Sequence, residues 1–214
     1  MGTVIYRKIT LVLSLFIILA LAMSATCFAD VDVDVVLAAY PASFLYSPDA
    51  DGFAAYDTTT GEGEEVDGNT SWIPNVRGGV GFDMPSLYLD LTAGVGYAYG
   101  GDVYTATWFL GDLATRFKVY GDDPEGVFVT LGPHASVIYF DPEWDGDTDI
   151  KLEETVGYMF GACFTVGKKI VSFSASLDYV YLPVDVDAPS GTLTNDDEFD
   201  LSGIALQLGV LFRF

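Results

Sequence analysis

Apolar and polar residues alternate along almost the whole chain after residue 30, and this period of two constrains the fold most strongly. Within residues 107–119 the odd positions are mostly apolar or small, whereas the even positions include Asp112, Arg116 and Lys118. Side chains of a β-strand point alternately to opposite faces, so this period indicates strands with one apolar face. Residues 87–99 and 171–181 divide in the same way. We predict eight strands, at 31–46, 71–84, 86–99, 105–120, 126–140, 152–166, 170–183 and 200–214.

The connections between these strands alternate in length. Tight turns are predicted at 84–86, 121–126 and 167–169, because Gly, Pro, Asp and Ser recur there. The other connections are mostly longer and polar, at 47–70, 141–151 and 184–199, with a short link at 100–104. This arrangement is typical of membrane barrels. We therefore predict an all-β chain, an eight-stranded antiparallel transmembrane up-and-down β-barrel formed by residues 30–214 as one domain.

The first 29 residues have the layout of a cleaved secretory signal peptide. Arg7 and Lys8 precede an apolar run at 9–22, and small residues follow before the expected cleavage after Ala29. The run is shorter than the roughly 18–20 residues that a membrane-spanning helix needs. A lipoprotein signal at Cys27 is the alternative, although Thr26 replaces the usual small residue and no Leu stands three positions before the cysteine. Export through the Sec translocon is the expectation.

The composition combines 50% apolar residues with a formal net charge of −22. Removing residues 1–29, which hold two of the nine basic residues and no acidic one, would leave 185 residues with a net charge of −24. Of the 31 acidic residues, 19 lie in or next to the connections of one end, at 49–67, 102, 141–149 and 185–200, which would make one mouth of the barrel anionic. Nucleic acid is excluded as a partner because clustered Lys and Arg are absent. Two cysteines and the single His134 exclude a disulfide framework and a multi-histidine metal centre, and no cofactor is expected.

The alternation alone leaves open which face of the barrel meets lipid, because a soluble ligand-binding barrel in the periplasm would turn its apolar face inward. Two features favour a membrane. The face opposite the apolar one is rich in Gly and Ser, as a narrow lumen requires. Aromatic residues also gather at the strand ends in two girdles, as at membrane interfaces. The expected girdles comprise Tyr97, Tyr99, Tyr139, Tyr179 and Tyr181 at the long-loop rim, and Phe82, Phe117, Phe164, Phe173 and Phe212 at the short-turn rim.

The last strand, residues 204–214, alternates and stops at the aromatic Phe214. Together with the signal peptide, the eight strands and the alternating loop lengths, this ending resembles the small outer-membrane barrels of Gram-negative bacteria, of the OmpA, OmpX and OmpW kind. The resemblance implies an outer-membrane location among lipid and lipopolysaccharide, and recognition of Phe212 and Phe214 by the barrel-assembly machinery. The family is functionally mixed, so the resemblance assigns no single activity. We expect a monomer.

An eight-stranded barrel is just wide enough for its own side chains to fill it. Because an unpaired buried ion costs several kcal/mol, Arg77 and Arg116 are expected to pair with Asp34, Asp90 or Asp112. A fixed ion network that plugs the barrel is the favoured interpretation, and a gated or selective path through the same charges is the alternative. Gln207 is expected in the lumen beside the network, whose predicted members are Asp34, Arg77, Asp90, Asp112, Arg116, His134 and Asp178.

Three prolines, Pro41, Pro74 and Pro133, fall within predicted strands. A closed barrel has no free edge at which a missing N–H is harmless, so we expect β-bulges at these positions.

His134 and Ser136 stand two apart on one strand face, where they could act as base and nucleophile. Outer-membrane lipid A deacylases are similar in carrying a His-x-Ser pair with a downstream Glu. However, those enzymes present their site to lipid, whereas His134 is predicted on the lumen face. The downstream acids Glu143, Glu153 and Glu154 have no fixed spacing. We therefore expect no enzyme activity and keep a deacylase as a minor alternative.

An acidic run follows the fifth predicted strand, and its residues 145–149 resemble the start of an EF-hand loop. Ile150 replaces the required glycine and Val156 takes the place of the twelfth-position Glu, so a solvated loop is favoured. Weak Ca²⁺ or Mg²⁺ bridging to lipopolysaccharide is the alternative. The candidate cation ligands are Asp141, Glu143, Asp145, Asp147 and Asp149.

The favoured function is therefore non-enzymatic: an integral outer-membrane barrel with a structural or surface-interaction role that its acidic external loops carry. The competing hypothesis is a narrow channel that passes small, apolar solutes through the lumen or through a lateral gap. A continuous apolar lining from the long-loop mouth would favour the channel, whereas charges at mid-depth favour the plug.

Overall fold

The computed structural model describes residues 31–61, 63–65, 69–101, 103–121, 126–146, 150–168 and 170–214. The chain divides into two units, Met1–Asp32 and Val33–Phe214, and the second unit holds the barrel. The predicted signal peptide lies outside the described residues. In the described part of the chain no helix has the length and apolar character needed to cross a membrane.

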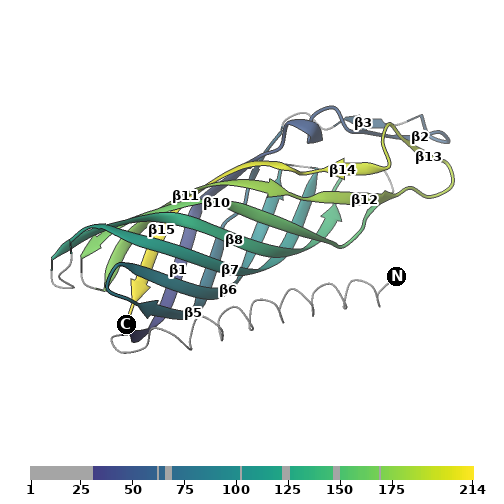
Figure 1. The fold of residues 1–214 in the computed structure, drawn as a ribbon. Coiled ribbons are helices and arrows are strands. Elements are labelled where there is room, and N and C mark those ends of the chain that lie inside the picture. Colours follow the sequence, from purple (N-terminus) through teal and green to yellow (C-terminus); the bar gives the residue numbers. More distant parts are fainter. Residues whose placement is uncertain are drawn as a thin grey trace. The chain divides into compact units, whose positions relative to one another are not determined.

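Eight antiparallel strand lines, each formed by one strand or by two consecutive strand segments, form a closed barrel, which confirms the predicted fold (Figure 1). The last strand pairs with the first, from Val36 opposite Arg213 to Tyr46 opposite Ile204, and this pairing closes the wall. The short strand β4 (Thr70–Trp72) and β5 together form the second line. The long strands are β1 (Asp32–Tyr46), β5 (Asn75–Asp83), β6 (Leu87–Gly100), β7 (Tyr104–Tyr120), β8 (Val127–Trp144), β10 (Thr155–Lys168), β11 (Val171–Tyr181) and β15 (Gly203–Arg213).

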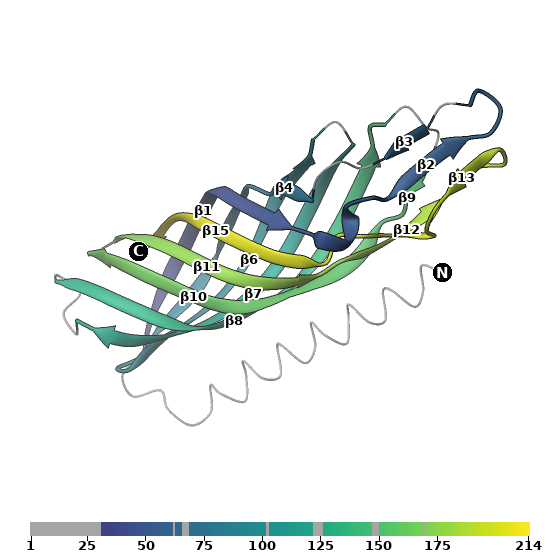
Figure 2. The ribbon, with the colours of Figure 1, turned by 90° about the horizontal axis from the view of Figure 1, so that it is seen from above.

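The long connections are not plain loops, as the sequence had led us to expect, but carry short strands at one end of the barrel (Figure 2). One three-stranded sheet joins β13, β2 and β3, and a second joins β14, β12 and β9. A single 3-10 turn, η1 (Pro48–Ala50), follows β1. The short strands are β2 (Ala54–Asp57), β3 (Gly63–Glu65), β9 (Lys151–Leu152), β12 (Pro183–Asp187), β13 (Thr192–Thr194) and β14 (Glu198–Asp200).

The fifth long strand also ends later than predicted, at Trp144 rather than at residue 140. It pairs with β7 as far as Tyr104 opposite Trp144. The Trp144 ring packs edge-on against Phe53 and Phe199, at centroid distances of 5.9 and 6.2 Å. These apolar contacts give the strand a reason to continue beyond the polar residues Asp141 and Glu143.

The three prolines differ in their effect on the wall. At Pro41 the register with β15 shifts between Ala39 and Ala42, which is the expected bulge. Pro74 instead lies in the break between β4 and β5, and the two segments pair with β6 in the same register. At Pro133 the expected bulge is wrong, because β8 keeps its register with β10 throughout and with β7 on both sides of this residue; the β7–β8 register shifts only further along, between Lys118 and Tyr120. The β7–β8 ladder skips residues 115 and 116 there, so the missing N–H costs local pairing and not a change of register.

The barrel interior has two layers. Toward the long-loop end it is apolar and buried, with Tyr104, Trp108, Leu110, Ile138 and Phe140 among its members. Toward the short-turn end it is polar and charged. The predicted polar, small-residue lumen is therefore found only in the layer toward the short-turn end, which we call the lower layer. The reason is that the inward side chains of a single strand differ in polarity along its length. On β7, Trp108 and Leu110 are apolar, whereas Asp112 and Arg116 are charged.

Candidate functional site

The lower half of the barrel interior holds a connected set of ion pairs, and this set is the candidate site. At its short-turn end Arg116 of β7 pairs with Asp90 of β6. Arg213 of β15 reaches the same carboxylate at 2.6 Å and Asp34 of β1 at 3.3 Å. The Arg213 guanidinium also lies 4.1 Å from the centre of the Tyr88 ring. A side chain at Gly81 would collide with Arg213 and Asp90, so the glycine gives the ions their room.

His134 of β8 lies between two carboxylates in the middle of the barrel. Its Nδ1 is 2.9 Å from Asp112 and its Nε2 is 2.5 Å from Asp178. Ser136 donates to Asp112 at 2.6 Å, and Ser176 donates to Asp178 at 2.7 Å. A neutral imidazole offers one N–H and one lone pair, and a lone pair facing a carboxylate is repulsive. With Asp112 and Asp178 both ionised, the geometry therefore requires a proton on both nitrogens and a positive charge on His134.

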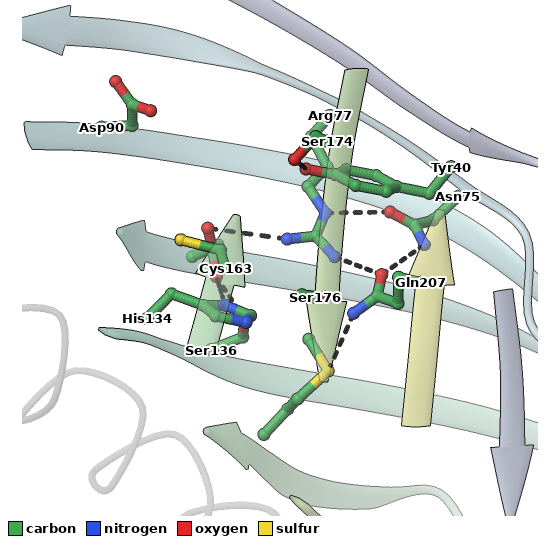
Figure 3. A network of polar contacts seen from close by, with 12 residues as sticks. Tyr40, Asn75, Arg77, Asp90, His134, Ser136, Cys163, Ser174, Ser176 and Gln207 are labelled. Carbon is green, nitrogen blue, oxygen red and sulfur yellow. Dashed lines mark hydrogen bonds and ion pairs between the residues drawn. The ribbon is translucent and has the colours of Figure 1, made fainter. Parts of the chain in front are cut away.

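Arg77 connects the histidine cluster to neutral side chains (Figure 3). Its guanidinium lies 3.5 Å from Asp112 and donates to Gln207 at 2.6 Å and to Asn75 at 2.9 Å. The Asn75 amide donates to Gln207 at 3.0 Å, and Gln207 in turn donates to Asp178 at 2.9 Å. Strands that are far apart in sequence are thus tied together across the barrel.

All seven predicted network residues lie inside the barrel and take part in these contacts. Sequence reasoning missed two further members, Arg213 and Asn75. The signal for both was parity: Arg213 stands between the outward Phe212 and Phe214, and Asn75 shares its face with Arg77. With His134 charged, the described network holds four cations and four carboxylates: Arg77, Arg116, His134 and Arg213 with Asp34, Asp90, Asp112 and Asp178.

The apolar layer above the network is filled by its own side chains. A void of about 20 Å³ remains there, lined by residues that include Tyr104, Trp108 and Met159. This is close to the roughly 10–15 Å³ that a single water needs. Phe199 closes the layer from above, against Phe53 at 5.1 Å and Tyr104 at 5.5 Å between ring centres.

The His-x-Ser pair does not have the geometry of a base and a nucleophile. Ser136 donates to Asp112 and not to His134, whose two nitrogens face Asp112 and Asp178. Both side chains are buried inside the barrel. A nucleophile must be hydrogen-bonded to its base and reachable by substrate, so this arrangement does not support acyl transfer.

The candidate cation ligands are only partly described. Asp141, Glu143 and Asp145 are exposed at the outer end of β8, whereas Asp147 and Asp149 lie outside the described residues. No group of three or more His, Cys, Asp or Glu side chains in the described part is arranged to hold a metal ion.

Two acids on the outer strands have shifted pKa values of opposite sign. Desolvation by the surrounding chain raises the pKa of Glu198, an exposed residue on β14, and the neighbouring Asp200 and Asp185 raise it further. The pKa of Asp57 is lowered instead, because the backbone N–H groups of Thr59 and Thr60 donate to its carboxylate at 2.6 and 3.2 Å. The acidic end of the barrel thus contains both a carboxylate that is repelled by neighbouring acids and one that backbone N–H groups stabilise.

The aromatic residues at the chain end lie on the outer wall. The Phe212 and Phe214 rings are parallel, with centres 6.4 Å apart, and Phe214 is exposed. The backbone of Phe214 exchanges two hydrogen bonds with Val35 of the first strand, which holds the last residue in the closed wall.

No protein-family model matches the sequence, and no curated protein matches it. Among solved structures, the chain is similar to the outer membrane protein OprG from Pseudomonas aeruginosa, at 11% identity and a TM-score of 0.48 over 85% of this chain and 95% of that chain. For Neisserial surface protein A (NspA) the values are 12%, 0.45, 86% and 99%. For the outer membrane protein AlkL, solved in DMPC lipid bilayers, they are 13%, 0.44, 85% and 90%. At identities this low, no shared activity, ligand or partner follows.

Proposed function

We propose that this chain is an integral outer-membrane β-barrel with a plugged lumen, and that its acidic outer strands and loops carry a structural or surface-interaction role. The observation that carries the proposal is the inverted distribution of side chains. Exposed aliphatic and aromatic residues surround the barrel wall, including Leu131, Phe160 and Leu177, while the charged residues of the lower half are buried inside. An apolar band of this extent is unfavourable in water and favourable in lipid.

The plug is supported by the completeness of the interior ion network. Each charged member meets an opposite charge, and the four cations balance the four carboxylates. Removing one ion from such a network leaves another uncompensated, at a cost of roughly 3–5 kcal/mol. A network with this penalty has little tendency to open for a passing solute.

The surface role is supported by the charge of the outer end. Exposed acids there include Asp141, Glu143 and Glu198, whereas the basic Lys151 stands nearby on β9. Divalent cations shared with the phosphate groups of lipopolysaccharide would connect this end to the surrounding lipid. Lipid and lipopolysaccharide are therefore the proposed partners, and the proposed state is a monomer without catalytic activity.

Biogenesis follows from the two chain ends. Residues 1–29 would direct export through the Sec translocon and be cleaved, and Phe212 and Phe214 would be recognised by the barrel-assembly machinery. Deleting Phe214 should reduce the amount of inserted barrel while leaving the cleavage of residues 1–29 intact.

Fractionation tests the proposed location. We expect the chain in the outer-membrane fraction after an alkaline wash, with faster gel migration in unboiled than in boiled samples. Recovery in the soluble periplasmic fraction would contradict the proposal and favour a soluble barrel. For the surface role, chelation of divalent cations should lower the unfolding temperature in native membranes and leave it unchanged in detergent.

A second candidate function, a narrow path for small apolar solutes, is favoured by the apolar upper layer. Its lining runs from Phe199 down to Met159, and Ile73 lies in the wall next to the break at Pro74. A solute would have to displace the aromatic side chains and leave sideways above the ion network. Uptake of a small alkane into vesicles would support this path if the barrel raised its rate above that of empty vesicles and if Trp108→Ala raised it further.

A further inference from the structure

The outward face of the barrel has a hollow of about 280 Å³ on the first three strand lines. The Asn75 side chain is turned inward to Arg77 and Gln207, so the other lining residues form the accessible surface. None of them is charged. The lining residues are Ala39, Pro41, Pro74, Asn75, Val76 and Val95.

The hollow exists because two prolines remove backbone hydrogen-bond donors from the contact between β1 and the strand formed by β4 and β5. The Ile73 N–H donates to the Ser43 carbonyl at 2.8 Å, and toward the short-turn end this contact between the two strands continues at Pro41 and Pro74. Proline has no backbone N–H, so neither residue can donate to the other strand. Pro41 lies in the bulge of β1 and Pro74 in the gap between β4 and β5, and the outward side chains beside them are small.

Aromatic residues form the upper rim of the hollow, toward the long-loop end. The Trp72 indole is 45% exposed, and its Nε1 donates to the Pro41 carbonyl at 2.8 Å, which fixes the ring beside the hollow. Tyr97 and Tyr99 follow Val95 along β6 and are also exposed. Trp and Tyr favour the level of lipid headgroups, so the hollow lies at the depth of the first part of an acyl chain.

We propose that this hollow is a seat for one acyl chain of a membrane lipid, whose headgroup lies at the level of Trp72 and Tyr97. The inference rests on the proposed membrane location. The uncharged lining fits a hydrocarbon and offers nothing to an ionic solute. A second copy of the chain is a poor occupant, because a stable interface needs about 800 Å² from each partner and six residues around one hollow supply far less.

Photolabelling in vesicles tests the seat. The full barrel is inserted into phosphatidylcholine vesicles that contain a phosphatidylcholine with a diazirine on its acyl chain, and labelled residues are mapped by peptide mass spectrometry. We expect severalfold more label on residues 39–41, 74–76 and 95 than on the outward residues of β8. Ala39→Phe should fill the hollow and remove this excess. Ala135→Phe, the same change at an exposed position on β8, should leave it intact.

Val95→Phe fills the hollow from another strand and should act like Ala39→Phe, so the test survives if one variant fails to fold. Gel migration of unboiled samples verifies folding. Even labelling around the wall in an inserted barrel would overturn the seat alone. A disulfide between two copies of an Ala39→Cys variant in the same vesicles would also overturn it, in favour of a second copy. Release of the chain by an alkaline wash would contradict the membrane location itself, and the seat with it.

Discussion

His134 is the residue on which the centre of the polar layer depends, because both of its nitrogens face carboxylates. His134→Ala leaves Asp112 and Asp178 without this cation, and we expect a loss of roughly 3–5 kcal/mol of unfolding free energy. Urea unfolding of the refolded barrel in micelles, followed by tryptophan fluorescence, measures it. The control is Ser172→Ala, which removes one hydrogen bond to the Leu211 carbonyl and should cost only about 0.5–1.5 kcal/mol. Equal losses for the two variants would contradict the assigned charge.

Substitution of Ser136 tests whether the chain has lipid A deacylase activity. Its hydroxyl donates to Asp112, so we expect Ser136→Ala to leave the acylation of lipid A unchanged in cells that produce the barrel. Mass spectrometry of extracted lipid A compares the variant with the unaltered chain. Deacylated lipid that appears with the unaltered chain and disappears with the variant would establish an enzyme.

The inward position of individual residues could be read from the sequence, because parity places Asp90, Asp112 and Asp178 on the polar side of their strands. Their partners could not be read in the same way. Which cation reaches which carboxylate depends on the stagger between strands, and this stagger brings Arg213 of the last strand to Asp90 of the third. Sequence distance carries no information on such a contact.

At the scale of elements, two glycines with opposite surroundings test the strand pairing. A Cβ on Gly132 would collide with the Thr115 carbonyl of β7, whereas a Cβ on Gly111 meets no atom within 4 Å. Gly132→Ala should therefore destabilise the barrel by about 1–3 kcal/mol, the usual cost of overpacking. Gly111→Ala should be neutral or stabilising by up to about 1 kcal/mol. Urea midpoints of the two variants measure the difference, and a tolerated Gly132→Ala would contradict the close approach of β7 and β8.

The outer strands should respond to pH through Glu198. Its raised pKa means that the folded strands hold the proton more tightly than the unfolded ones, so ionisation at neutral pH weakens them and acidification strengthens them. Glu198→Gln should increase the hydrogen-exchange protection of residues 183–187 and 198–200 at neutral pH and reduce its pH dependence. A variant less protected than the unaltered chain at neutral pH would contradict this sign.

Asp57 is the matched control, because its pKa is lowered and the sign reverses. Its contribution is present at neutral pH and is lost as the pH falls through its folded pKa. Asp57→Asn should therefore reduce the protection of residues 57–60 at neutral pH and have little effect in acid.

The eight long strands could be predicted from alternation alone, to within a few residues at most ends. The short outer strands could not, because segments of two to five residues carry too little periodicity. Pairing partners far away in the sequence define them, as when Leu193 of β13 lies opposite Tyr56 of β2. The alternation also could not predict that the register continues unchanged past Pro133.

Across the whole molecule, the many apolar residues and the acidic residues that give the net charge of −22 occupy different regions. Apolar residues cover the outer wall and fill the upper interior, while acids occupy the ion network and the outer strands. The apolar upper layer was not expected, although Trp108 and Leu110 share the inward parity of Asp112. The aromatic side chains of this layer and the ion network below it are the two barriers that the proposed plug would place before a solute from the long-loop end.

Electrical recording from the refolded barrel in planar bilayers tests the plugged interior most directly, with insertion verified by gel migration of unboiled samples. We expect no steady conductance above that of the bare bilayer, because in the proposed plug the apolar layer and the balanced ion network would both close the lumen. A large, steady conductance that Trp108→Ala further increases would contradict the plug and make the chain a channel.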